Sequence, residues 1–371
     1  MSKFIPVSQP YLTQREEDYV LDAVKSGWVS SIGKYIDAFE KRFAEFCGTK
    51  FALAANNGTT ALHLALVTAG IGPGDEVIVP DLTFVATANA VAYTGATPVI
   101  VDIDRDTLCI CPTAAAAAVT PKTRAIIPVH IYGHPADMDA LSEIAERHQI
   151  LIIEDAAEAH GAEYKGQRVG SFGKAGVFSF YGNKIITTGE GGMITTNDPE
   201  FNSRARLLRD QAMSKEKRYW HEEIGFNYRM TNLQAALGLA QMEHIDDMLV
   251  RRSEIFAAYR AAIRTSEGVR LNHTAQWAKN VFWMVCLEVD KFNLESRDAF
   301  MARLKSRGVD SRPYFYPMSA MPMFKCKPAP VAAAKSVIGL NLPTYHALSN
   351  EEIQWIASVV NEELELLFGK A

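Results

Sequence analysis

A lysine follows an apolar run that has the pattern of a buried strand. Lys184 closes the stretch 177–184, and the glycine-rich segment 187–192 comes directly after it. A primary amine held near a strand end can condense with an aldehyde when its pKa is low enough to free the lone pair. The simpler interpretation is a surface lysine that extends its charge into water, because most lysines are exposed. Lys184 alone is therefore only a candidate nucleophile.

A second apolar run ends in acidic residues. Residues 150–153 are continuously aliphatic and lead into Glu154 and Asp155, which predicts a buried parallel strand. In open α/β sheets, ligands bind at the carboxyl ends of strands, where Asp155 would lie. Pyridoxal 5′-phosphate (PLP) needs a lysine for a Schiff base and a carboxylate that keeps its pyridine nitrogen protonated. Lys184 and Asp155 match this pair, and the alternative for Asp155 is a helix N-cap.

A third segment has the composition of a phosphate-binding turn. Gly58, Thr59 and Thr60 stand immediately before the helical pattern 61–66. Free backbone N–H groups and the positive end of the helix dipole favour an anion at such a position. The alternative is that Thr59 or Thr60 is a plain N-cap.

The composition favours a small-molecule partner. The chain has 371 residues, of which 48% are hydrophobic, so it can bury a large core in about two to three domains. Its formal net charge is −5, and its lysines and arginines are scattered. This pattern gives no support for binding to nucleic acid or to a membrane surface, although a few local cations suffice for an anionic substrate.

The cysteines and the N-terminus indicate a reducing compartment. An odd number of cysteines without a disulfide framework is typical of cytoplasmic proteins. Cys109 and Cys111 have no second Cys or His pair nearby, so we predict no metal site. The N-terminus lacks the apolar core of a signal peptide, and no run approaches a membrane span, so we expect a cytoplasmic protein. The cysteines are Cys47, Cys109, Cys111, Cys286 and Cys326.

Short apolar runs alternate with helical patterns between residues 50 and 200. Helix is predicted at 138–148 and as a short turn at 114–118. This β-α-β rhythm predicts an α/β fold with a mostly parallel sheet covered on both faces. The predicted strands are 76–80, 97–102, 125–130, 150–155, 176–180 and 193–196.

The pattern changes after Thr231. A long helical stretch over 232–263, with a break, is expected to connect two domains. A strand at 282–289 and helices at 295–307 and 350–368 then indicate a smaller α+β domain. We predict a large domain over residues 1–240 and a small one over 241–371, with the N-terminal segment packed on the small domain or on a partner.

The three segments, in this order, resemble the DegT/DnrJ/EryC1/StrS family of nucleotide-sugar aminotransferases. The likeness extends from Gly27 to Pro343 and covers most of the chain. It implies a fold-type I, aspartate-aminotransferase-like structure, PLP as the cofactor, and a large sheet domain with a smaller C-terminal domain. Within the family, segments 180–193, 218–221 and 225–232 are most similar to members that aminate C4 of a GDP-linked sugar.

The resemblance also implies a reaction. L-Glutamate would give its amino group to C4 of GDP-4-keto-6-deoxy-D-mannose, forming GDP-perosamine and 2-oxoglutarate, for lipopolysaccharide O-antigen synthesis. Related C4 aminotransferases for UDP- or dTDP-linked 4-keto-6-deoxy sugars carry similar Gly-Asn-Lys segments, so the nucleotide stays open. Dehydratases of the family have histidine where this chain has Lys184, which argues against dehydration. A non-catalytic PLP-fold regulator is the alternative from another class.

Catalytic and cofactor roles follow from the same resemblance. Lys184 would form the Schiff base and carry the proton, and Asp155 would bind the pyridine nitrogen. Asn227 would come from a neighbouring subunit, which implies a homodimer with shared active sites. The alternative for Phe84 is core packing. The implied cofactor contacts are the phosphate ligands Gly58, Thr59, Thr60, Ser179 and Asn227, the ring contacts Phe84 and Ala157, and Glu158, which stands where most members have Gln.

Substrate contacts are implied at positions that carry aromatic, hydroxyl, amide or basic side chains. Arginine suits an anionic diphosphate, and an aromatic ring can stack on a base or cover a sugar. For each position the alternative is a structural hydrogen bond or a packing role. The positions are Trp28, Ser30, Tyr35, His130, Asn183, Arg229, Tyr314, Phe315 and Tyr316.

Overall fold

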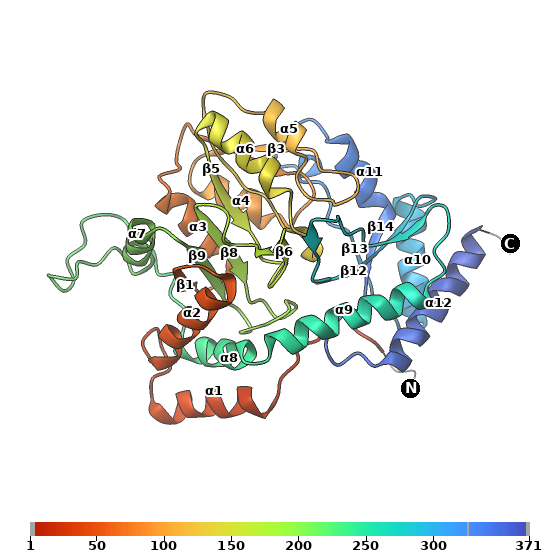
Figure 1. Cartoon of the computed structure of the whole chain (residues 1–371), viewed down its shortest axis with the longest axis horizontal. Helices are drawn as coiled ribbons and strands as arrows, with labels where there is room; N and C mark the ends of the chain where they lie inside the picture. The colour runs from red at the N-terminus through yellow and green to blue at the C-terminus, as the bar shows by residue number, and fades with distance from the viewer. Residues whose placement is uncertain (1–3, 325, 369–371) are drawn as a thin grey trace.

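The computed structural model describes residues 4–324 and 326–368. At its centre is a seven-stranded sheet in the order β1-β9-β8-β5-β4-β2-β3, in which β9 runs antiparallel to both neighbours and the other pairs are parallel (Figure 1). Its strands are β1 (Phe51–Ala55), β2 (Glu76–Pro80), β3 (Thr97–Val101), β4 (Thr123–Ile126), β5 (Leu151–Asp155), β8 (Ala175–Ser179) and β9 (Gly192–Thr196).

Helices cover both faces of this sheet. Successive side chains of a strand point to opposite faces, and Ile152 and Ile153 of β5 accordingly belong to two different apolar clusters. One face is covered by α3 (Gly58–Thr68), α4 (Ala86–Tyr93) and α7 (Pro199–Arg209). The other is covered by α2 (Lys34–Cys47), α5 (Pro112–Ala117) and α6 (Met138–His148).

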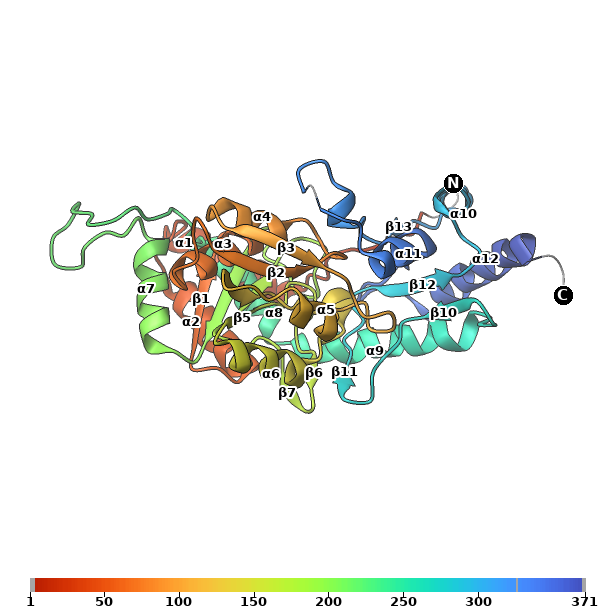
Figure 2. The same ribbon diagram turned by 90° about the horizontal axis from the view of Figure 1, so that it is seen from above.

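A four-stranded antiparallel sheet forms the second part of the molecule, at the opposite end from β1 in Figure 2. A third apolar cluster lies between this sheet and its helices. The strands, in order, are β10 (Val269–Leu271), β12 (Val285–Val289), β14 (Gly339–Leu342) and β13 (Arg312–Pro313), and the helices are α10 (Leu294–Ser306), α11 (Pro330–Ile338) and α12 (Asn350–Phe368).

Helix α9 (Ile245–Ala262) connects the two parts. Its Met248 belongs to the first cluster, whereas Ile255 and Tyr259 belong to the third. The N-terminal segment also reaches the second part, where Ile5 forms a parallel bridge to Val309 and joins the third cluster. The remaining elements are α1 (Gln14–Ser26), α8 (Asn232–Met242), β6 (Glu163–Tyr164), β7 (Gln167–Arg168), β11 (Ala278–Lys279) and two 3-10 turns, η1 (Ile131–Gly133) and η2 (Met318–Ala320).

The predicted mostly parallel sheet is confirmed, with β2 at the predicted bounds and each of the other predicted strands overlapped by a strand of the structure. The break in the helical stretch falls between α8 and α9. Strand β1 and helices α1 and α2 were not predicted. Three of the five residues in β1 are alanine, which has a low strand propensity, so burial rather than propensity explains this strand. The boundary at residue 240 stays a prediction and lies just before the end of α8.

Across residues 4–324 and 326–368, no helix combines the length and the apolar character that crossing a bilayer requires.

Candidate active site

Lys184 lies in the loop between β8 and β9, and its side chain is only 10% exposed. Its Nζ lies 3.6 Å from Oε1 of Glu158 and 4.0 Å from the centre of the Trp283 ring. Burial lowers the pKa of this amine, and the charges of Glu158 and Asp155 act in the opposite direction. A lower pKa increases the fraction of the amine that has a free lone pair. The interpretation of Lys184 as a solvated surface residue is therefore wrong.

Asp155 ends β5, and it is 8% exposed. Its carboxylate accepts hydrogen bonds from the Thr87 hydroxyl at 2.8 Å and from the N–H of Ala157 at 3.2 Å. Turns rather than a helix follow the strand, so Asp155 is not a helix N-cap. Burial raises the pKa of Asp155, against these hydrogen bonds and the charge of Lys184. A nearby cation, such as a protonated ring nitrogen, would favour its ionised form.

Glu158 is a second buried carboxyl beside the same lysine. Its Oε2 accepts a hydrogen bond at 2.9 Å from the N–H of Tyr132, which lies in turn η1 with a φ of 53°. Burial raises the pKa of Glu158, and the charge of Lys184 opposes that rise. The chain therefore holds one amine and two carboxyls together in an environment with little water.

The phosphate-type turn packs closely against the end of β8. Asn57 is the N-cap of α3 and accepts from the N–H of Thr60 at 2.8 Å, so neither Thr59 nor Thr60 is the cap. A Cβ added to Gly58 would lie 2.8 Å from the Cβ of Ser179, so glycine lets the first turn of α3 approach the end of β8. The first turn of a helix presents N–H groups without intrahelical acceptors. Gly58, Thr59 and Ser179 thus border a cradle suited to an anion.

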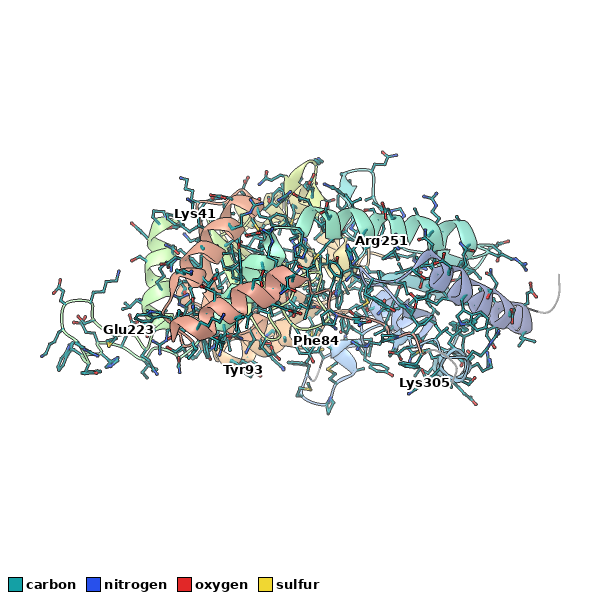
Figure 3. The ribbon with its side chains drawn as sticks, turned by 90° about the horizontal axis from the view of Figure 1, so that it is seen from below. Lys41, Phe84, Tyr93, Glu223, Arg251 and Lys305 are labelled. Atoms are coloured by element: carbon teal, nitrogen blue, oxygen red, sulfur yellow. The ribbon has the colours of Figure 1, made fainter. Side chains whose placement is uncertain are left out.

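Phe84 follows β2 and is 56% exposed, which argues against the core-packing alternative. Its ring centre lies 6.0 Å from that of Phe315, and Phe315 in turn stacks on Tyr132 at 5.4 Å. In Figure 3, Phe84 lies near the middle of the long axis of the molecule. Ala157 is half-buried in the turn after β5. Both side chains are accessible to a planar ring. Their contacts with the PLP ring stay predictions.

These residues fit PLP. A buried carboxyl is available for a cationic ring nitrogen, a buried amine for an aldehyde, and a glycine-lined helix start for a phosphate. Lys184 lies 3.6 Å from Glu158, which stands in the turn directly after Asp155, and the charge of Lys184 acts on the pKa of Asp155, so the carboxyl and the amine belong to one site.

The predicted contacts near the N-terminus lie together against the start of α8. The side chain of Asn232 donates to the carbonyl of Trp28 at 2.7 Å, and its N–H donates to that of Ser30 at 2.6 Å. Asn232 also accepts from the N–H of Tyr35, and the Tyr35 hydroxyl donates to Asp22 at 2.7 Å. Trp28 and Ser30 are exposed, whereas Tyr35 is buried. Trp28 and Ser30 thus remain accessible, whereas the burial and hydrogen bonds of Tyr35 favour the structural alternative.

His130 and Tyr314 are predicted substrate contacts that the structure buries. The ring of His130 is fully buried, with Nε2 3.1 Å from Glu154 and Nδ1 accepting from the N–H of Ala136 at 3.0 Å. Tyr314 packs against Gly339, where an added Cβ would lie 2.1 Å from its ring. Both observations favour the structural alternative over a substrate contact. Their neighbour Phe315 is half-buried, and Tyr316 is exposed near Arg297.

Asn227 and Arg229 lie on the long segment between α7 and α8, which extends from one end of the molecule, with Glu223 on it (Figure 3). Asn227 is exposed and accepts a hydrogen bond from Arg229, whose guanidinium pairs with Asp210 at 2.8 Å. Asn183 places its carbonyl 2.8 Å from the indole nitrogen of Trp283. Its own side-chain oxygen is buried and unpaired.

Sequence reasoning missed three residues that support the predicted residues Lys184, Asp155 and Glu158. Thr87 binds Asp155, Tyr132 binds Glu158 through its backbone, and Trp283 faces Lys184. No short motif marks them, because they come from α4, η1 and the start of the second part. Only the tertiary fold, which the local sequence pattern does not reveal, brings them to the site.

His160 lies fully buried among the rings of Phe43, Phe178 and Phe180. Burial lowers its pKa to about 3, whereas an unfolded histidine has a pKa of about 6.5. Between these values only the unfolded chain takes up the proton. The contribution of neutral His160 to the free energy of unfolding is therefore fully present above about pH 6.5. As the pH falls below that value, the contribution decreases by about 1.4 kcal/mol per pH unit.

His160→Phe should therefore lose less thermal stability than wild type between pH 7.5 and pH 5.5. Differential scanning calorimetry checks this, with the exposed His148→Gln variant as the control. Equal losses in His160→Phe and wild type would contradict the assignment.

Comparison with known proteins identifies the family of this chain. Residues 10–361 match the DegT/DnrJ/EryC1/StrS aminotransferase family. The chain is 49% identical over 364 residues to GDP-perosamine synthase of Caulobacter vibrioides, covering 97% of this chain and 98% of the relative. It superposes on S. venezuelae DesV in complex with a ketimine intermediate (TM-score 0.89, 36% identity, 96% and 98% covered). The PLP form of Streptococcus pneumoniae Spr1654 gives a TM-score of 0.94 at 29% identity, with 98% and 99% covered. The chain therefore belongs to the DegT/DnrJ/EryC1/StrS aminotransferase family and is a PLP-dependent sugar aminotransferase of fold type I.

Proposed function

We propose that this enzyme transfers the amino group of L-glutamate to C4 of GDP-4-keto-6-deoxy-D-mannose, giving GDP-perosamine and 2-oxoglutarate. The observation that carries the choice of substrate is the 49% identity to a GDP-perosamine synthase along nearly the whole of both chains. The reaction type rests on the family and on the amine and carboxyls gathered around Lys184.

Lys184 and Asp155 have separate roles in the proposed reaction. Bound PLP supplies the aldehyde that takes up the amino group and the ring that withdraws electrons from the reacting carbon. Lys184 would hold PLP through its Nζ, and the same Nζ, when free, would take a proton from the donor and give one to the sugar. Because burial lowers the pKa of Lys184, a larger fraction of the amine has a free lone pair with which to act as a base. Asp155 keeps the ring nitrogen protonated through its own negative charge.

Glu158 adds a carboxyl where it faces Lys184 at 3.6 Å. Its Oε2 is held by the N–H of Tyr132, so Oε1 is the oxygen directed at the amine. We infer that Glu158 would orient the free amine of Lys184 between the two half-reactions.

The proposal includes a homodimer with shared active sites. The segment between α7 and α8 extends away from the body of the chain (Figure 1), and Asn227 is exposed at its base, where it forms a bridge to Asp210. This exposed side chain suits a contact across a subunit interface. The phosphate cradle of a partner would be its target.

A substrate panel tests the proposal. GDP-, UDP- and dTDP-4-keto-6-deoxy sugars are incubated with L-glutamate, and 2-oxoglutarate formation gives kcat/KM for each. We expect the GDP-mannose derivative to exceed the others by at least about tenfold, because differential transition-state binding sets substrate choice. A preference for a UDP- or dTDP-linked sugar would overturn the nucleotide and leave the reaction type standing.

A further inference from the structure

Trp283 contacts the loop that carries Lys184 in two ways. Its indole N–H donates to the carbonyl of Asn183 at 2.8 Å, one residue before Lys184. The face of its ring lies 4.0 Å from Nζ of Lys184, within the range of a cation–π interaction. Trp283 thus holds both the backbone before the lysine and the end of its side chain.

The backbone of Trp283 is itself fixed by a buried arginine of α9. Arg252 of α9 is buried and donates to the carbonyl of Trp283 at 3.0 Å and to that of Thr344. The guanidinium therefore anchors the backbone of Trp283 to the second part of the molecule. Because α9 also packs in the first cluster, this anchor is shared by both parts.

Strained backbone surrounds the same position. Phe282, directly before Trp283, has a φ of 48°, and Tyr132 has a φ of 53°. Gly133, next to Tyr132 in the chain, packs on the backbone of Phe282 and Trp283, since a Cβ added there would be 2.8 Å from the nitrogen of Trp283. Left-handed backbone at large residues costs free energy and persists where the surroundings enforce it, often at functional sites.

We propose that Trp283 is a positioning residue that fixes the Nζ of Lys184 for reaction. This proposal rests on the proposed role of Lys184, and in it Trp283 does not contact the substrate. The ring fixes the end of a flexible side chain, and the indole N–H fixes the loop that carries it. Precise placement of a reacting group contributes strongly to rate, and misplacement by about 1 Å costs about 10²-fold.

Titratable groups also face this amine. Glu158 and Asp155 raise the pKa of Lys184, and burial lowers it. His160 lies close enough for the Lys184 charge to lower its own pKa. Against this background, an aromatic face favours the ammonium form, so removing the ring while keeping an apolar side chain should lower the pKa of Lys184.

The test compares Trp283→Leu, Trp283→Phe and wild type as full-length proteins. Trp277→Leu is the matched control, because Trp277 is half-buried in the same segment and packs on Tyr164 at 4.9 Å. The first readout is kcat and KM. The second is the pH dependence of the rate at which protein freed of PLP recaptures it, followed by absorbance.

We expect Trp283→Leu to lower kcat by about 10- to 100-fold with both KM values within about twofold. Its recapture midpoint should move to lower pH by about one unit, with a smaller shift in Trp283→Phe. An unchanged midpoint and kcat would overturn the inference, as would a midpoint that moves upward, which would make the ring a barrier to water. A higher KM at unchanged kcat would overturn it in favour of a substrate contact.

Lys184→Ala in the recapture assay separates the two proposals. If this variant recaptured PLP as an imine like wild type, the role of Lys184 would be wrong whatever Trp283 does. If it did not, the Trp283 comparison stands by itself.

Discussion

Lys184→Ala should lower kcat by at least about 10³-fold, because the change removes both the nucleophile and the proton carrier of the site. General acid–base catalysis alone contributes about 10²- to 10⁴-fold. The variant should still bind PLP, since Asp155 and the cradle at Gly58 remain. Steady-state formation of 2-oxoglutarate measures the loss.

Lys184→Arg is the control for charge. Arginine keeps a cation near Glu158 but remains protonated in proteins, so it supplies no free lone pair. Both variants should lose activity while their melting temperatures stay within a few degrees of wild type. Steady turnover at the wild-type rate by Lys184→Ala would exclude Lys184 as the reacting amine.

Asp155→Ala should lower kcat by about 10²- to 10³-fold, because electrostatic stabilisation of the cationic ring is lost. Asp155→Asn is the sharper variant, since its side chain keeps the shape and can still hydrogen bond to Thr87 and to the N–H of Ala157. We expect the two to lose comparable activity. The charge rather than the hydrogen bonds would then be the decisive property.

Stability measurements decide between catalysis and structure. Burial raises the pKa of Asp155, so the buried charge is no asset to the folded state, and Asp155→Asn should melt near the wild-type temperature. Thr87→Val is the matched control, because it removes one hydrogen bond to Asp155 and leaves the carboxyl. If unfolding accounted for the entire loss of activity in Asp155→Asn, the role of Asp155 would be structural.

The sequence predicted those features that local pattern encodes. The aliphatic run before Asp155 and the strand at β2 are continuous apolar segments, and α6 and α12 have clear helical periodicity, so all four were found. The antiparallel direction of β9 was beyond reach, since a strand's sequence does not state its direction. Helices α1 and α2 lie outside the β-α-β pattern and were missed.

Within the site, chemistry-bearing residues were predictable and their supports were not. Lys184 and Asp155 were recognisable by their residue types and by their positions after apolar runs. Burial decided the cases of His130 and Tyr314, which look like ligand contacts in sequence and lie in the interior. Trp283 is distant along the chain from Lys184, and only the folded arrangement brings them together.

The meeting of Gly58 with Ser179 has an evolutionary consequence. A Cβ at Gly58 would fall 2.8 Å from that of Ser179, and one at Gly192 would fall 2.4 Å from the carbonyl oxygen of Asn57. Three separate segments of the chain thus meet so closely that the side chains at these positions cannot become larger independently. As the sequence drifts, a larger residue at position 58 should survive only alongside a compensating change at position 179, so the two codons are expected to covary among descendants of this enzyme.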